Sequence, residues 1–126
     1  MRHQKDSVRF ASCAALQKLA RRTAGARKTK VAWQPVQQTS SVPCSPQLAG
    51  RLKRAVKKHQ REVASLPSGA GHDAAVMAQI TPAAMLFVRC KGGVSHHPDE
   101  SVSAADARVA FEVMNDFLQR MAEDYA

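Results

Sequence analysis

Three absences narrow the classes of protein to which this chain of 126 residues can belong. Its cysteines, Cys13, Cys44 and Cys90, are odd in number and have no paired spacing. This pattern argues against a disulfide framework and predicts a reducing, cytoplasmic location. The start of the chain, Met1–Asp6, is charged and has no apolar core, so it is not a secretory signal. No window approaches the roughly 18 apolar residues that a membrane span needs, so no membrane partner is expected.

Acidic side chains are nearly absent from the first half of the chain. Residues 1–62 hold fifteen Lys and Arg against only Asp6 and Glu62, a charge of +13, whereas residues 63–126 carry −4; the net charge is +9. Such asymmetry favours either a small basic nucleic-acid-binding protein or one piece of a larger, charge-balanced protein. The basic helix face at 51–58 is expected to be solvated, because no aromatic side chain is interleaved with it as in nucleic-acid contacts.

Aromatic residues are also few, at 5% of the chain. The hydrophobic fraction of 44% nevertheless lies near the ordinary globular range, which excludes disorder throughout. A chain of this length has room for about one small domain with a respectable core.

The N-terminal part of the chain is expected to form a helix and an edge strand. A helix is predicted over 6–22, where Asp6 can cap the start and apolar side chains recur along one face. Residues 29–36 alternate between apolar and polar, and Pro35 limits that run to the edge of a sheet. The polar connector at 37–43 then predicts a domain boundary.

The remainder predicts three helices and one buried strand. The first helix covers about 45–59, because serine at the N-cap and proline at the first position are favoured there. A short helix is predicted over 73–79, and a long helix with an apolar stripe of helical period begins after Ser103. Between them, residues 84–89 are apolar on both faces, which is typical of an interior strand covered on each side.

A glycine-rich turn precedes this strand and its helix, with the sequence Ser68-Gly69-Ala70-Gly71-His72-Asp73-Ala74. It leads into a helix N-terminus, where amide donors can receive an anion or a developing oxyanion. From the residues alone, an ordinary glycine-rich N-cap is the more frequent explanation. The turn has neither the Lys-Ser/Thr of a phosphate-binding loop nor the third glycine of a dinucleotide fingerprint.

A second turn follows the strand, with the sequence Lys91-Gly92-Gly93-Val94-Ser95-His96-His97-Pro98-Asp99-Glu100. It leaves the C-terminal end of the predicted strand, where open α/β sheets place their sites. The imidazole of His96 can ligate a metal, and its neighbour His97 is expected to point elsewhere. One histidine is not a metal site, because zinc needs three or four ligands. From the residues alone, an unliganded loop histidine is therefore the more frequent case.

Together, the two turns and the intervening Met85-Leu86-Phe87-Val88 resemble the C-terminal part of M20-type metallo-amidohydrolases. Within these the match is to the branch with allantoate amidohydrolase, N-carbamoyl-L-amino-acid hydrolase and β-ureidopropionase. The resemblance covers about residues 1–120 and is strongest from 66 to 101. It implies an α/β fold in which 1–42 end an α+β lid and dimerisation domain and 43–126 form the C-terminal segment of the catalytic domain.

The resemblance also implies roles for four residues. His96 matches the final metal ligand, and His72 matches the catalytic histidine that holds the substrate and polarises its scissile carbonyl, with Gly71 beside it. Arg2 matches an arginine that binds the substrate carboxylate, for which a guanidinium fork is chemically apt. In the complete enzyme the resemblance further implies a divalent metal pair, zinc or manganese, a homodimer, and a small ureido or carbamoyl carboxylate as substrate.

The family's other metal ligands, its bridging carboxylate and its general base have no counterpart in this chain. With one ligand and no base, the chain is expected to bind no metal and to be inactive alone. The expected function is therefore that of a fragment of a metal-dependent hydrolase of linear amide or amidine C–N bonds; the alternative is a small basic nucleic-acid-binding protein. The isolated chain is also expected to be helical, loosely packed and apt to associate through the edge of the 84–89 strand, which has no partner strand.

Overall fold

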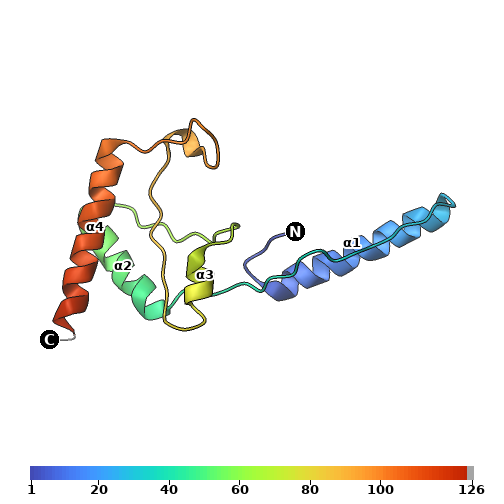
Figure 1. Ribbon diagram of the computed structural model, residues 1–126, viewed down its shortest axis with the longest axis horizontal. Coiled ribbons are helices and arrows are strands. Elements are labelled where there is room, and N and C mark those ends of the chain that lie inside the picture. The colour runs from blue at the N-terminus through green and yellow to red at the C-terminus, as the bar shows by residue number, and fades with distance from the viewer. Residues whose placement is uncertain (125–126) are drawn as a thin grey trace. The chain divides into compact units, whose positions relative to one another are not determined.

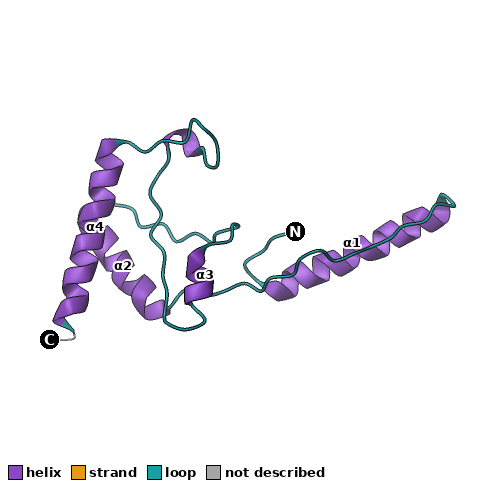
Figure 2. Ribbon diagram, viewed as in Figure 1, coloured by secondary structure: helices purple, strands orange, loops and turns teal. Residues whose placement is uncertain are grey.

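The computed structural model describes residues 1–124, and the regular structure of this part of the chain is entirely helical (Figures 1 and 2). The elements follow in the order α1 (Asp6–Ala26), α2 (Pro46–His59), α3 (Asp73–Met77), the 3-10 helix η1 (Lys91–Gly93) and α4 (Ala104–Glu123). Over residues 1–124, none of these helices is both long and apolar enough to cross a membrane.

The chain divides into two compact units. The N-terminal unit is Met1–Pro43 with Leu66–Gly71, and the C-terminal unit is Cys44–Ser65 with the described chain from His72 onward. The backbone therefore passes from one unit to the other inside the first glycine-rich turn, between Gly71 and His72.

The two predicted strands are not formed. Residues 29–36 and 84–89 are irregular, and no strand occurs anywhere in residues 1–124 (Figure 2). A strand needs a neighbour that pairs with its backbone N–H and C=O groups. Here the one backbone bond at the border of the apolar run joins the N–H of Ser45 to the carbonyl of Ala83 at 2.7 Å, and no ladder follows it. The described chain thus does not display the α/β class that its sequence predicted.

Helix α1 begins at residue 6, as predicted, but its C-terminal end and its N-cap differ from the prediction. It continues through Gly25 to Ala26 instead of ending at residue 22, and the next turn includes Lys28 with a φ of +52°. Its N-cap is Lys5, which provides no side-chain cap, so the predicted capping role of Asp6 is wrong. Asp6 is instead the first helical residue, where a carboxylate favourably faces the helix dipole.

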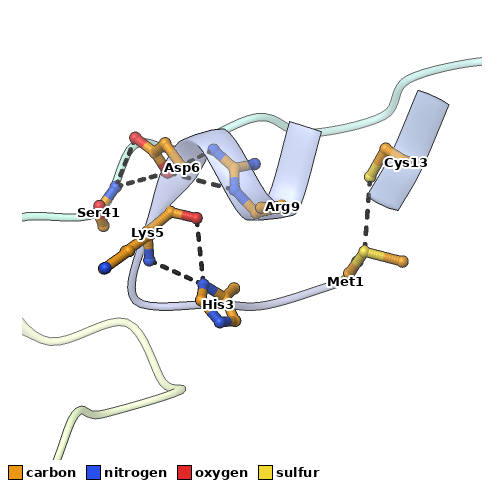
Figure 3. A network of polar contacts seen from close by, with 7 residues as sticks. All are labelled: Met1, His3, Lys5, Asp6, Arg9, Cys13 and Ser41. Carbon is orange, nitrogen blue, oxygen red and sulfur yellow. Dashed lines mark hydrogen bonds and ion pairs between the residues drawn. The ribbon is translucent and has the colours of Figure 1, made fainter. Parts of the chain in front are cut away.

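The carboxylate of Asp6 joins the start of α1 to the segment that returns beside it (Figures 1 and 3). Arg9 donates to Asp6 Oδ1 at 2.9 Å, and the backbone N–H of Ser41 donates to both carboxylate oxygens at 3.2 Å. The hydrogen bond from Arg9, more than the one from Ser41, lowers the pKa of Asp6. A single side chain thereby ties residues 35 positions apart in the N-terminal unit.

The core of the C-terminal unit lies between α2 and α4, which pack against each other (Figure 1). Both predicted N-termini are confirmed: Ser45 Oγ accepts from the N–H of Leu48 at 3.4 Å, and Ser103 Oγ accepts from the N–H of Asp106 at 3.0 Å. The helix α3 is shorter than predicted and ends at Met77. The apolar side chains that the unit buries come from the two facing helices and are Leu52, Ala55 and Val113.

Ion pairs flank this apolar contact. Lys58 Nζ lies 2.5 Å from Asp116 Oδ1, and Arg51 pairs with Asp124, the residue directly after α4. Asp116 is buried and also accepts from Arg120, one turn further along α4, at 3.1 Å. The hydrogen bond from Lys58 is the main reason that the pKa of Asp116 is lowered. The basic face of α2 is thus partly neutralised by acidic side chains of α4.

Candidate functional site

His72 occupies the position immediately before α3 and has an extended backbone. Its half-buried ring meets the ring of Phe87 edge-on, with the centroids 5.6 Å apart and the planes at 67°. This is the geometry that aromatic pairs favour. Phe87 was predicted only as part of a buried strand, so its contact with the candidate catalytic histidine was missed. The signal was weak, because only the fold brings together residues fifteen positions apart.

The first glycine-rich turn is closed locally and has Arg2 beside it. Ser68 Oγ accepts from the N–H of Ala70 at 3.1 Å, and a Cβ placed on Gly69 would lie 3.9 Å from Cδ of Arg2. Both belong to the N-terminal unit. At Gly71 an added Cβ would meet nothing within 4 Å, and the φ of this residue is not left-handed. Neither crowding nor backbone strain therefore requires glycine at position 71 in this chain.

The second turn is a closed loop with glycines where the backbone needs them. Gly92 and Gly93 have φ values of +64° and +71°, a region that a side chain would disfavour. At the base of the loop, the N–H of Lys91 donates to the carbonyl of Ser101 at 2.8 Å. The loop departs from an irregular segment, because the strand predicted to support it is not formed.

Two residues before this loop, Arg89 binds the start of α4. Arg89 donates through Nε and Nη2 to Asp106 Oδ1, at 3.0 and 2.6 Å. Ser103 Oγ donates to the other oxygen of the same carboxylate at 2.6 Å. The bond from Ser103, followed by that from Arg89, lowers the pKa of Asp106. This pair was not predicted, since residues 17 positions apart have no local sequence signal.

The two loop histidines are held differently. Nδ1 of His96 lies 2.8 Å from Ser95 Oγ, and its backbone N–H donates to Glu100 Oε2 at 2.7 Å. Nδ1 of His97 instead accepts from the backbone N–H of Asp99 at 3.2 Å. Each ring thus makes its hydrogen bond through Nδ1 within the loop, and Nε2 of either histidine has no hydrogen-bond partner among the described residues.

The residues of this chain do not by themselves fit a metal ion. In residues 1–124, no three or more His, Cys, Asp and Glu side chains gather closely enough to hold one. The carboxylate of Glu100 contacts His96, but through its backbone N–H and not through its ring. Within residues 1–124, His96 is therefore an isolated imidazole and not part of a set of ligands. Arg2 and Gly71 belong to the N-terminal unit, and His72 and His96 to the C-terminal unit.

Comparisons with known proteins give a consistent result. The sequence model of the family described as Peptidase family M20/M25/M40 matches residues 6–120. A protein of Oryza sativa subsp. japonica named probable allantoate deiminase is 35% identical over all of this chain and 28% of its own length. The allantoate deiminase of Arabidopsis thaliana is 44% identical over 63% of the chain and 17% of its own length.

A bacterial relative extends the same pattern. The N-carbamoyl-L-amino acid amidohydrolase of Geobacillus stearothermophilus is 32% identical over 98% of this chain and 30% of its own length. The chain therefore spans less than a third of the length of these curated relatives. No solved structure matches it significantly.

Proposed function

From the membership of this chain in peptidase family M20/M25/M40, we propose that it is the C-terminal part of an amidohydrolase that cleaves linear amide or amidine C–N bonds of ureido compounds. The observation that carries the proposal is the alignment of essentially the whole chain with relatives named for allantoate and for N-carbamoyl-L-amino acids. Both substrates in these names combine a ureido group with a carboxylate. The named relatives are enzymes of this one kind, so the comparisons give no support to the alternative, a small basic nucleic-acid-binding protein.

We further propose that residues 1–42 end a lid and dimerisation domain and that residues 43–126 are the closing segment of an α/β catalytic domain. The division of the chain into two compact units, with a boundary after Pro43, supports this arrangement. The 84–89 segment would become a strand only beside strands supplied by the rest of the protein. Its apolar residues on both faces support that expectation.

Two proposed contacts with the substrate differ in purpose. Arg2 would bind the substrate carboxylate, and a guanidinium can do so through two parallel hydrogen bonds. His72, with Gly71 beside it, would hold the scissile carbonyl and donate a hydrogen bond to the oxygen as negative charge develops there. The packing of His72 on Phe87 and the position of Arg2 beside the glycine-rich turn support these assignments.

His96 would provide one ligand to a divalent metal pair, zinc or manganese. The remaining ligands would come from the part of the protein that lies outside this chain, together with the general base. A metal pair in such enzymes supplies Lewis acidity. Because the described residues do not form such a centre, the chain by itself is proposed to be inactive. Three cysteines without disulfide partners, Cys13, Cys44 and Cys90, support a cytoplasmic location for the complete homodimer.

A chimera tests this function directly. In the rice relative, the segment that matches this chain would be replaced by residues 1–126, and ammonia release from allantoate and from N-carbamoyl amino acids would be measured. We expect activity with at least one of the two substrates. Replacing His72 with Ala should lower kcat/KM roughly 100-fold or more, as is typical when an oxyanion donor is removed.

The metal content of the same chimera tests the role of His96. His96→Ala should lower the bound metal measured by elemental analysis, and His97→Ala is the matched control that should leave it unchanged. A folded, metal-loaded chimera inactive on both substrates would contradict the proposed function. Equal metal content in the two variants would contradict the assignment of His96.

A further inference from the structure

His96 has a left-handed backbone conformation, which is uncommon for residues other than glycine. Its φ is +58°, and in residues 1–124 it shares a positive φ with only one other non-glycine residue, Lys28. The left-handed region is disfavoured for a residue with a Cβ, so neighbouring groups must stabilise it where it occurs. The whole segment from Ser95 to Glu100 is exposed, and burial therefore cannot supply this stabilisation.

Glu100 is the side chain that contacts the strained position. Its Oε2 accepts from the backbone N–H of His96 at 2.7 Å, a short bond of the strong, charge-assisted kind. Its Oε1 lies 3.7 Å from the thiol of Cys90, on the other side of the loop. The N–H of Glu100 also donates to the carbonyl of His97 at 2.9 Å. Glu100 thus contacts Cys90, just before the loop, and both His96 and His97 within it.

Other contacts of the loop do not replace this one. The bond between Lys91 and Ser101 closes the base of the loop but does not reach His96. The contact from Ser95 Oγ is with ring atom Nδ1, so it sets the ring and not the backbone of His96. With Nδ1 held by Ser95, Nε2 is the ring nitrogen of His96 that has no hydrogen-bond partner among the described residues.

We propose that Glu100 is a positioning residue that holds the backbone of His96 in its left-handed conformation and so directs Nε2 outward from the loop. This inference rests on the proposed function, in which His96 is the metal ligand of the loop. Glu100 itself is not proposed to touch substrate or metal, because its carboxylate is engaged by the loop amide.

The experiment measures the backbone of His96 in the isolated chain. Amide hydrogen exchange and the amide proton shift of His96 would be recorded by NMR for the native chain, Glu100→Ala, Glu100→Gln and Asp99→Ala. Loss of the bond to the carboxylate should speed exchange of the His96 amide roughly tenfold. It should also move the amide proton upfield, because a strong acceptor has been removed.

The other two variants separate positioning from general destabilisation. Gln at position 100 keeps a side-chain oxygen that can accept from His96, so most of the protection should return. Asp99→Ala removes an adjacent carboxylate that does not contact the His96 amide, and exchange there should stay native. A native His96 amide that exchanges as fast as in an unstructured peptide, or equal exchange in Glu100→Ala and the native chain, would overturn the proposal.

Metal affinity of the chimera distinguishes failure of the positioning role of Glu100 from failure of the proposed function. Glu100→Ala should weaken metal binding about 10- to 100-fold, as residues that orient ligands commonly do, and Glu100→Gln should restore most of it. If His96→Ala left metal binding unchanged, the proposed role of His96 would fail while the exchange result for Glu100 still stood. If His96→Ala removed the metal and Glu100→Ala had no effect on affinity or exchange, only the positioning role would fail.

Discussion

The two units of this chain contain long helices of similar length that differ in what covers them. Helix α1 has 21 residues and buries only Ala24, whereas α4 has 20 residues and buries Val113 and Asp116. The reason is that α4 has α2 as a packing partner, while α1 has only the irregular segment that returns beside it (Figure 1). Helix formation in this chain is therefore a local property, but burial is not.

The N-terminal unit has an open apolar groove as a result. The groove lies between α1 and the segment that follows it, and its apolar lining includes Leu16, Leu19, Val31 and Trp33. These side chains are between 43% and 48% exposed. The proposed lid domain would supply the missing layer, since the chain spans less than a third of its relatives. The same substitution should consequently have very different effects in the two units.

The largest expected effect comes from placing a carboxylate in each unit in turn. Leu52→Asp puts a charge where the side chain is 7% exposed, and it should destabilise the α2–α4 pair by about 4 kcal/mol or more. Leu19→Asp, at 48% exposure, should cost within about 1 kcal/mol. Urea unfolding followed by far-UV circular dichroism measures both. Equal losses would show that the two units have comparable cores and would remove the contrast.

Acid should affect the C-terminal unit next. Because the pKa of Asp116 is lowered in the folded chain, its contribution to stability is present above the unfolded pKa of about 3.9 and is lost as pH falls below it. The native chain should therefore lose helical signal on acidification through this range. Asp116→Asn should be less stable at pH 7 and should show a flatter acid profile.

Asp99→Asn is the matched control for this acid transition. The carboxylate of Asp99 is 82% exposed and lies on the loop, outside the α2–α4 contact. Its replacement should leave the acid profile of the helical signal as in the native chain. An Asp116→Asn variant with the native profile would show that the bonds from Lys58 and Arg120 do not set the acid stability of this unit.

A smaller effect is expected at the corresponding carboxylate of the N-terminal unit. Asp6→Ala removes the acceptor that holds Ser41, so the returning segment should separate from α1. Trp33 is the single tryptophan and reports on this unit alone. Since Trp33 is already 44% exposed, acrylamide quenching should rise by at most about twofold on release. Ser103→Ala, in the C-terminal unit, should leave Trp33 quenching unchanged, and the opposite pattern would contradict the role of Asp6.

The same contrast explains which parts of the fold could be predicted from the sequence. The starts of α2 and α4 were predictable because Ser45 and Ser103 bind amides within the next turn. The strand at 84–89 was predicted from its own apolar residues, but its formation depends on partner strands that the described chain does not supply. Asp6 was predicted to cap the start of α1, but its carboxylate instead accepts a hydrogen bond from the N–H of Ser41, which is distant in sequence.

For the candidate site, the sequence proposed residues but not the contacts that hold them. His72 and His96 were recognisable from glycine-rich turns and family resemblance. Phe87, Glu100 and Arg89 support these turns through contacts that depend on the path of the backbone. Of these contacts, only the hydrogen bond between His96 and Glu100 joins residues close in sequence, four positions apart, so it could have been predicted from the sequence.

The smallest expected effect tests whether the contact with the ring of Phe87 holds the imidazole of His72 in place. Phe87→Leu keeps an apolar side chain but removes the aromatic edge contact, which is worth about 0.5–1.5 kcal/mol in such pairs. The ring protons of His72 should lose the ring-current shift due to Phe87, and the helical signal from α2 and α4 should hardly change. Phe111→Leu is the matched control, because Phe111 lies exposed on α4 and should leave the His72 protons unmoved. If both variants shifted them equally, or neither did, Phe87 would not be what orients this imidazole.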